Sequence, residues 1–219
     1  MIHMLRDPLL TPEDTARHLQ MPLATLRHWL RDKAAGTPLV HCVEPVTPDA
    51  PALPFVAVVE AYVLRCLSEL SLTPEQLRDA VGALRSGFTD PYALANRRIA
   101  DDGVEFFINY ADCDELARVG DRRLPLREAV VDYLGCIVWA PAEVYPARLR
   151  LRWYAEPASV VIDPEVRSGV PVVERTGLPV QDVVERWRAG ESYEAVARRH
   201  GLSPAEVAAI VRAAGAEGP

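Results

Sequence analysis

Cationic side chains gather between Arg27 and Lys33, in the segment LRHWLRDK. Arg27 and Arg31 are four residues apart, so a helix would present them on one face, with His28 beside them. A guanidinium group donates a fork of hydrogen bonds that fits phosphate oxygens and the major-groove edge of guanine. We therefore predict that this face contacts double-stranded DNA. The predicted contact residues are Thr25, Arg27, His28, Arg31 and Lys33.

Two short helices joined by a tight turn are predicted to position these side chains. Thr11 is a suitable N-cap, and Pro12 fits the first helical position. The first helix should end before Pro22, because proline disfavours helical geometry in the residue that precedes it. Apolar residues then recur every three or four positions, which gives the second helix one buried face. They are Leu23, Leu26, Trp29 and Leu30. This pattern is typical of a helix-turn-helix.

Residues 11–33 resemble the helix-turn-helix of MerR-like regulators. Thr25-Leu26-Arg27 followed by Trp29 fits that family's pattern T-L-R-x-[YW]. The resemblance implies that the second helix binds DNA, whereas a plain helical hairpin is the alternative interpretation. Residues 39–43 are expected to form a short strand, and the proline-rich residues 47–54 a loop, which together would make a wing.

Other residues capable of chemistry form no recognisable site. The cysteines are widely spaced, so buried thiols explain them better than a metal site; they are Cys42, Cys66, Cys113 and Cys136. The spacing of the possible zinc ligands does not favour a site either; they are His18, His28, His41 and Cys42. An acidic cluster is better read as a solvated turn than as a divalent-metal site; it holds Asp112, Asp114 and Glu115. We expect no metal, no cofactor and no enzymatic activity.

The charge of the chain is distributed unevenly. Its 219 residues carry a formal net charge of −7, yet residues 1–36 hold five Lys or Arg against four Asp or Glu. A local basic face can still meet phosphates, although long-range steering toward DNA would be weak. No apolar run approaches the length of a membrane span, so we expect a cytoplasmic protein without a membrane partner.

The middle of the chain shows helical and strand-like patterns without a chemical motif. Residues 53–70 predict a helix with a broad apolar stripe, which suits a core or a partner surface. Residues 71–86 predict a second helix with a capping box at Thr73 and Gln76. Asp101-Asp102-Gly103 favours a hairpin, and residues 126–139 favour another helix. We interpret this region as a spacer, a dimer surface or a ligand pocket.

The C-terminal segment repeats the helix-turn-helix pattern. A strand at 160–162 and a helix at 180–189 precede two further helices, and Ser203 with Glu206 predicts a capping box for the last one. With an offset of 181 residues, Thr11 corresponds to Ser192, and Leu26 to Val207. The helix before the last turn offers Arg198, Arg199 and His200 to phosphates.

Residues 162–207 resemble a small tri-helical family of bacterial domains. The shared pattern runs from I-D-P through G-V-P-V-V and G-L-P-V to G-L-S-P-A-E-V. That family is often encoded beside PIN-like ribonuclease toxins and is regarded as antitoxin. The chain departs from the pattern at Arg175-Thr176-Gly177-Leu178, so the usual arginine of that turn is absent or shifted. Combined with the N-terminal pattern, the chain resembles the longer VapB-type antitoxins.

These observations predict a mainly α protein with small β elements, in the α+β class. We expect a winged helix-turn-helix in residues 1–88, an α+β region in 89–157 and a tri-helical unit in 158–219. The resemblance implies a homodimeric antitoxin that represses its own operator and neutralises a PIN-like ribonuclease. Arg167 and Arg175 are the expected toxin contacts. The alternative is a ligand-sensing MerR-like regulator without a toxin.

Overall fold

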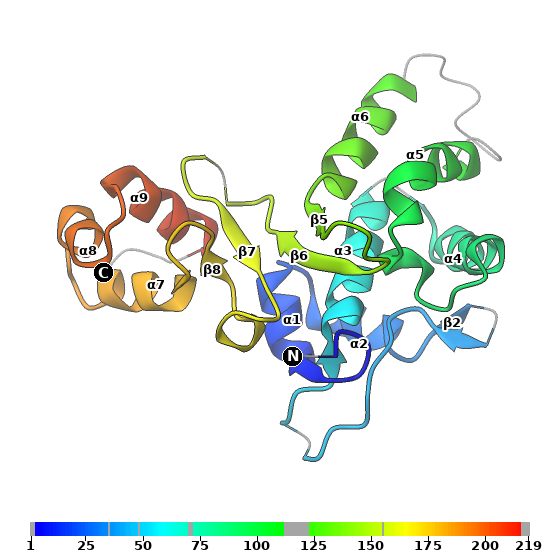
Figure 1. The fold of residues 1–219 in the computed structure, drawn as a ribbon, viewed down its shortest axis with the longest axis horizontal. Coiled ribbons are helices and arrows are strands. Elements are labelled where there is room, and N and C mark those ends of the chain that lie inside the picture. The colour runs from blue at the N-terminus through cyan, green and yellow to red at the C-terminus, as the bar shows by residue number, and fades with distance from the viewer. Residues whose placement is uncertain are drawn as a thin grey trace. The chain divides into compact units, whose positions relative to one another are not determined.

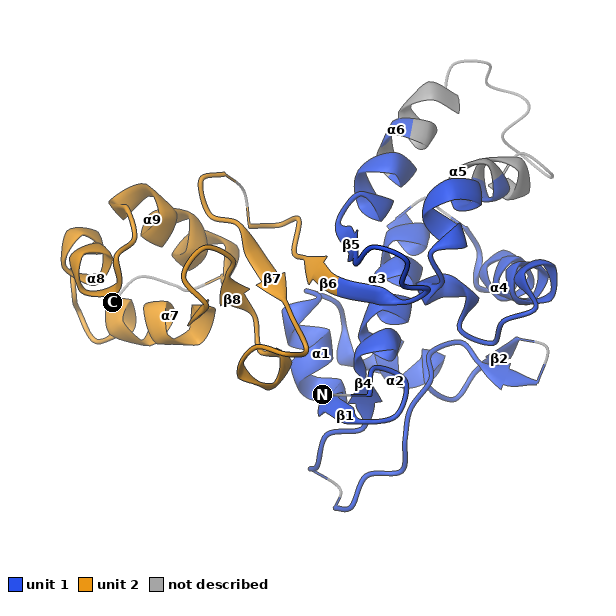
Figure 2. Ribbon diagram, in the orientation of Figure 1, with its two compact units in different colours: residues 1–147 blue, residues 148–219 orange. Residues whose placement is uncertain are grey.

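The computed structural model describes residues 3–34, 36–47, 49–69, 72–111, 123–154 and 156–215. It separates two compact units, residues 1–147 and residues 148–219, which are coloured in Figure 2. Helices dominate and the sheets are small, so the predicted α+β class is confirmed (Figure 1). The sequence predicted three parts, residues 1–88, 89–157 and 158–219, and this finer division stays a prediction.

Unit 1 contains six α-helices and several short strands among its described residues. The helices are α1 (Pro12–His18), α2 (Leu23–Trp29), α3 (Phe55–Glu69), α4 (Pro74–Phe88), α5 (Arg98–Ala111) and α6 (Arg123–Leu134). The strands are β1 (Pro8–Leu10), β2 (Lys33–Ala34), β3 (Thr37–Pro38), β4 (Leu53–Pro54) and β5 (Ile137–Trp139). β1 pairs antiparallel with β4, and β2 pairs antiparallel with β3.

Helix α3 forms the core of unit 1. Twelve of its 15 residues are buried, on all sides of the helix. A helix that is apolar all round is stable only when neighbours surround it, and α3 contacts α4, α6 and β4. Tyr62 and Phe55 are among the largest fully buried side chains. Within the described residues, the broad apolar stripe predicted for this segment therefore belongs to the core from Phe55 to Leu67.

Helix α5 occupies the segment for which the sequence predicted a hairpin, so that prediction was wrong. Gly103, the supposed turn residue, lies inside the helix at a close approach. A Cβ atom there would come within 2.7 Å of the Ile99 side chain and 3.6 Å of Leu134 of α6. The glycine thus serves the packing of α5 on α6 rather than a turn.

Helix α6 ends earlier than predicted. It stops at Leu134, and residues 137–139 form β5 instead of a last helical turn. Val131 is 48% exposed, whereas Val130 and Leu134 are buried.

Unit 2 combines short antiparallel strands with three helices among its described residues. Strand β6 (Pro146–Arg150) carries the chain into the unit, and β7 (Val160–Ile162), β8 (Val172–Val173) and β9 (Leu178–Pro179) follow in antiparallel order. The helices are α7 (Val180–Arg188), α8 (Tyr193–His200) and α9 (Pro204–Ala213), which group together in Figure 1. The predicted strand at 160–162 and the capping box of Ser203 and Glu206 are confirmed.

Among the described residues, the longest and most apolar helices still fall short of what crossing a membrane requires.

Candidate DNA-reading face

Helices α1 and α2 form the predicted helix-turn-helix. The Thr11 hydroxyl accepts a hydrogen bond from the Asp14 backbone N–H at 3.0 Å and so caps α1. Gln20 adopts a left-handed φ of 49° in the turn, and the Met21 N–H donates to the Ala16 carbonyl at 2.9 Å. Leu26 and Trp29 are buried beneath α2. The turn therefore fixes α2 with one face inward and the opposite face free.

The free face of α2 presents the predicted cations to solvent. Arg27, His28 and Arg31 are exposed, Lys33 follows in β2 and is exposed too, and Thr25 is half-buried. The Arg31 Nε donates to the Arg27 carbonyl at 3.0 Å, which holds Arg31 along the helix. Of the five predicted residues, Thr25, Arg27 and His28 lie on α2, Arg31 follows it directly, and Lys33 begins β2.

Acidic side chains accompany these cations. Glu13 of α1 forms an ion pair with Arg27. Asp32 accepts a two-pronged bond from Arg78 of α4, with Nη2 at 3.0 Å, and lies 3.5 Å from His28. The hydrogen bond from Arg78 holds the pKa of the Asp32 carboxyl below its usual value. Asp32 therefore stays ionised and ties the end of α2 to α4.

The wing differs from its prediction. The strands are β2 and β3, joined at Gly36 with a φ of 83°, whereas residues 39–43 form no strand. The carbonyl groups of Thr37 and Pro38 in β3, and of Leu39 just after it, accept hydrogen bonds from Arg85, with distances of 2.7–3.3 Å. The result is a short hairpin after α2, whose second strand is held by the buried guanidinium of Arg85.

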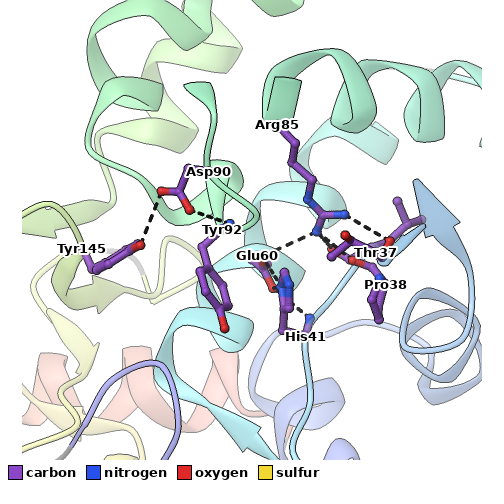
Figure 3. A network of polar contacts seen from close by, with 9 residues as sticks. Thr37, Pro38, His41, Glu60, Arg85, Asp90, Tyr92 and Tyr145 are labelled. Atoms are coloured by element: carbon purple, nitrogen blue, oxygen red, sulfur yellow. Dashed lines mark hydrogen bonds and ion pairs between the residues drawn. The ribbon is translucent and has the colours of Figure 1, made fainter. Parts of the chain in front are cut away.

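A buried polar network secures this hairpin (Figure 3). Glu60 of α3 is fully buried and accepts hydrogen bonds from the backbone N–H of His41 at 2.9 Å and from its ring Nδ1 at 2.8 Å. Arg85 of α4 lies 3.8 Å from the same carboxylate, and burial lowers the pKa of this guanidinium. The sequence showed Glu60 and Arg85 only as charges in apolar helices, because their partners are distant along the chain.

Aromatic rings extend the network. The Tyr92 ring lies 4.3 Å from the His41 ring between centroids, and 6.1 Å from that of Tyr145. Asp90 accepts hydrogen bonds from Asn96 at 2.6 Å and from the Tyr145 hydroxyl at 3.4 Å. Burial raises the pKa of Tyr145 to about 12. These contacts tie the loop before α5 to the buried Glu60 of α3 through His41.

Unit 2 repeats the helix-turn-helix in α8 and α9. Ser192 caps α8 by accepting from the Ala195 N–H at 3.2 Å, as Thr11 caps α1. Val207 is fully buried at the position that corresponds to Leu26. Of the cations predicted to meet phosphates here, Arg198 and Arg199 are exposed, with Arg199 3.5 Å from Glu191, and His200 is half-buried.

The two predicted toxin-contact arginines have different environments. Arg175 donates to the Gly201 carbonyl at 2.9 Å and to Glu206 at 3.2 Å, so it braces the turn between α8 and α9. Burial opposes ionisation of Glu206, but hydrogen bonds from Ser203 and Arg175 outweigh it, and the pKa of Glu206 lies below its usual value. Arg167 is exposed and has no ion-pair partner in the described part of the chain.

Metal-binding clusters are absent from the residues that the structure describes. Burial lowers the pKa of His18 to about 4, so this ring is neutral at physiological pH. Cys113 and the acidic residues near it lie outside the described residues.

Two protein families match the chain, one in each unit. Residues 8–81, from β1 into α4, match a family described as "Putative DNA-binding HTH domain", and residues 160–212 match "Protein of unknown function (DUF433)". Over 217 residues the chain is 30% identical to "Putative antitoxin VapB45" of Mycobacterium tuberculosis, with 90% of each chain covered. The chain belongs to the VapB45 family.

A solved structure supports the same relationship. The crystal structure of Rv2018 from Mycobacterium tuberculosis superimposes with a TM-score of 0.77 at 29% identity, covering 95% of this chain and all of that one. Because the match covers nearly all of both chains, residues of both units have counterparts in Rv2018, in the same order along the sequence. The matched helix-turn-helix family covers α1 to α3 and the first half of α4, so it includes Glu60, whereas Arg85 lies just beyond the matched residues.

Proposed function

We propose that this chain is the antitoxin of a type II toxin–antitoxin pair, which represses its own operator and neutralises a PIN-like ribonuclease. The observation that carries the DNA-binding half is the exposed face of α2, with Arg27, His28 and Arg31 opposite a buried Leu26 and Trp29. The match of residues 8–81 to a DNA-binding family supports it. The toxin-neutralising half is supported by the antitoxin named VapB45.

DNA recognition in this proposal uses α2 in the major groove and the β2–β3 hairpin beside it. An Arg contacts guanine through two parallel hydrogen bonds, and Thr25 at the start of α2 is placed to meet a neighbouring base. Lys33 at the base of the hairpin supplies a phosphate contact. Arg198 and Arg199 of α8 would add phosphate contacts without base readout.

A homodimer is expected on the operator, because one short recognition helix reads too few base pairs and a palindromic operator matches a two-fold axis. Sedimentation of the chain with DNA from upstream of its own gene should give two protomers on one duplex. Footprinting should protect two half-sites separated by about one helical turn. A single protomer protecting one half-site would contradict the dimer, and no protection at all would contradict DNA repression.

Toxin binding is assigned to unit 2, with Arg167 as the leading contact. Arg167, Ser168 and Gly169 all have left-handed φ values, of 51°, 54° and 74°. Non-glycine residues adopt this conformation at a cost of about 1–2 kcal/mol each, and such strain gathers at functional sites. An exposed guanidinium on this turn suits the carboxylate cluster of a PIN-like nuclease. Arg175, held by Glu206, instead shapes the surface around it.

The alternative is a ligand-sensing regulator that has no toxin. The apolar cavity of unit 1 between α3, α5 and α6, whose lining includes Tyr62, Phe107 and Leu134, has a volume of only about 10 Å³ and so has room for little more than one water molecule. Ligand sites usually add a few convergent polar groups to such a lining. Here the Tyr62 hydroxyl already donates to the Tyr133 carbonyl at 3.1 Å. We therefore favour the antitoxin, and we propose no catalytic activity and no cofactor for this chain.

A further inference from the structure

We propose that Glu13 is a positioning residue that sets the DNA specificity of Arg27. In this inference the Glu13 carboxylate orients the Arg27 guanidinium toward a base edge and disfavours its contact with phosphates. The inference rests on the proposed DNA binding by α2, and it concerns a residue of α1 rather than of the recognition helix.

The ion pair between Glu13 and Arg27 joins the two helices of the motif. Both side chains are about half exposed, with 51% of Glu13 and 55% of Arg27 accessible. The pair therefore lies on the surface that would face DNA. One guanidinium Nη of Arg27 donates to Glu13, and the planar group keeps further N–H donors in a fixed direction. A side chain held in this way loses less conformational freedom when it forms a two-pronged bond to guanine.

Glu13 differs from the other carboxylates of this surface. Asp14 is held in the cap of α1, where it accepts a hydrogen bond from the Thr11 hydroxyl at 2.8 Å. Asp32 is fixed by Arg78. Within the described residues, Arg27 is the only side chain that forms an ion pair with Glu13. The Glu13 carboxylate therefore contacts one proposed base-contacting residue, Arg27, and has little other structural role.

The negative charge of Glu13 has opposite consequences for the two kinds of DNA complex. On random DNA, Arg27 gains only phosphate contacts, and a carboxylate beside it both competes for the guanidinium and repels the phosphates. On the operator, Arg27 points toward a base edge, where the carboxylate orients it without meeting a phosphate. Glu13 should thus lower affinity for random DNA more than affinity for the operator.

The test compares Glu13→Gln with wild type by fluorescence anisotropy on two duplexes of equal length, the upstream DNA and a shuffled sequence. We expect affinity for the shuffled duplex to rise about three- to tenfold, while affinity for the upstream DNA stays equal or falls. The log–log salt slope on the shuffled duplex should steepen by about one unit, as one more phosphate is engaged. Circular dichroism of each variant checks that the fold is intact.

A double-mutant cycle with Arg27→Ala decides whether Glu13 acts through Arg27. In the Arg27→Ala background the effect of Glu13→Gln should largely disappear. Glu165→Gln, which removes one exposed carboxylate from unit 2, is the matched control for net charge and should leave both affinities unchanged. An unchanged ratio of the two affinities in Glu13→Gln, or an equal effect without Arg27, would overturn the role of Glu13. If wild type shows no preference for upstream DNA and Arg27→Ala changes nothing, DNA reading by α2 fails, and this inference fails with it.

Discussion

Replacing Glu60 with alanine is expected to lower the free energy of unfolding by about 3–5 kcal/mol, because it leaves a charged Arg85 buried without its carboxylate. Glu60 is fully buried and accepts two hydrogen bonds from His41. The variant therefore also leaves the backbone N–H and the ring nitrogen of His41 without their acceptor. Urea unfolding followed by circular dichroism measures the change. Glu60→Gln keeps the shape and one acceptor, and should lose less stability than Glu60→Ala.

Glu60→Ala should also disturb the proposed DNA-binding face formed by α2 and the β2–β3 hairpin. Arg85 holds the carbonyl groups of Thr37 and Pro38 in the β2–β3 hairpin and of Leu39 directly after it. Glu75→Gln is the matched control, since Glu75 is an exposed carboxylate on α4, the helix that carries Arg85. A loss of unfolding free energy below about 1 kcal/mol for Glu60→Ala would show that the contacts of Glu60 with His41 and Arg85 do not stabilise the fold.

The double variant Arg27→Ala/Arg31→Ala is expected to bind upstream DNA about 100-fold more weakly than wild type. Each lost arginine contact costs about 1–3 kcal/mol when it reads a base, and each lost phosphate contact flattens the log–log salt slope by about one unit. Both side chains are exposed and lie opposite the buried face of α2, so the variant should fold normally. Anisotropy titrations at several salt concentrations measure the affinity and the slope.

Arg198→Ala/Arg199→Ala is the charge-matched comparison, because it removes two exposed cations from the second helix-turn-helix. We expect a loss of about tenfold or less from this pair, with a similar loss on operator and shuffled DNA, as phosphate contacts carry no sequence information. If this pair abolishes binding while the Arg27 and Arg31 pair does not, the reading helix lies in unit 2.

Local signals in the sequence predicted the elements that carry the candidate site. Thr11 and Ser203 predicted their caps because a capping hydroxyl needs a partner only three residues away. The buried face of α2 was predicted in part: Leu26 and Trp29 are buried, whereas Leu23 and Leu30 are only half-buried. Side chains that project from a regular helix can be placed from spacing alone.

Features that depend on distant contacts could not be predicted in this way. Asp101-Asp102-Gly103 has the composition of a turn, yet packing of α5 against α6 keeps it helical. Residues 39–43 have the composition of a strand, but β3 ends at Pro38, and the Leu39 carbonyl accepts a hydrogen bond from the distant Arg85. The pairing of Glu60 with His41 and Arg85 joins three segments, and no local pattern connects them.

The most direct test of the account is inhibition of the neighbouring nuclease by this chain. The gene beside its own should encode a small ribonuclease, and that enzyme is purified and titrated with the full-length chain. We predict complete loss of ribonuclease activity near equimolar chain, with Arg167→Glu inhibiting much less well than wild type and Arg212→Glu, at another exposed arginine of unit 2, inhibiting normally. Ribonuclease activity that persists in an excess of the full-length chain would contradict the antitoxin function.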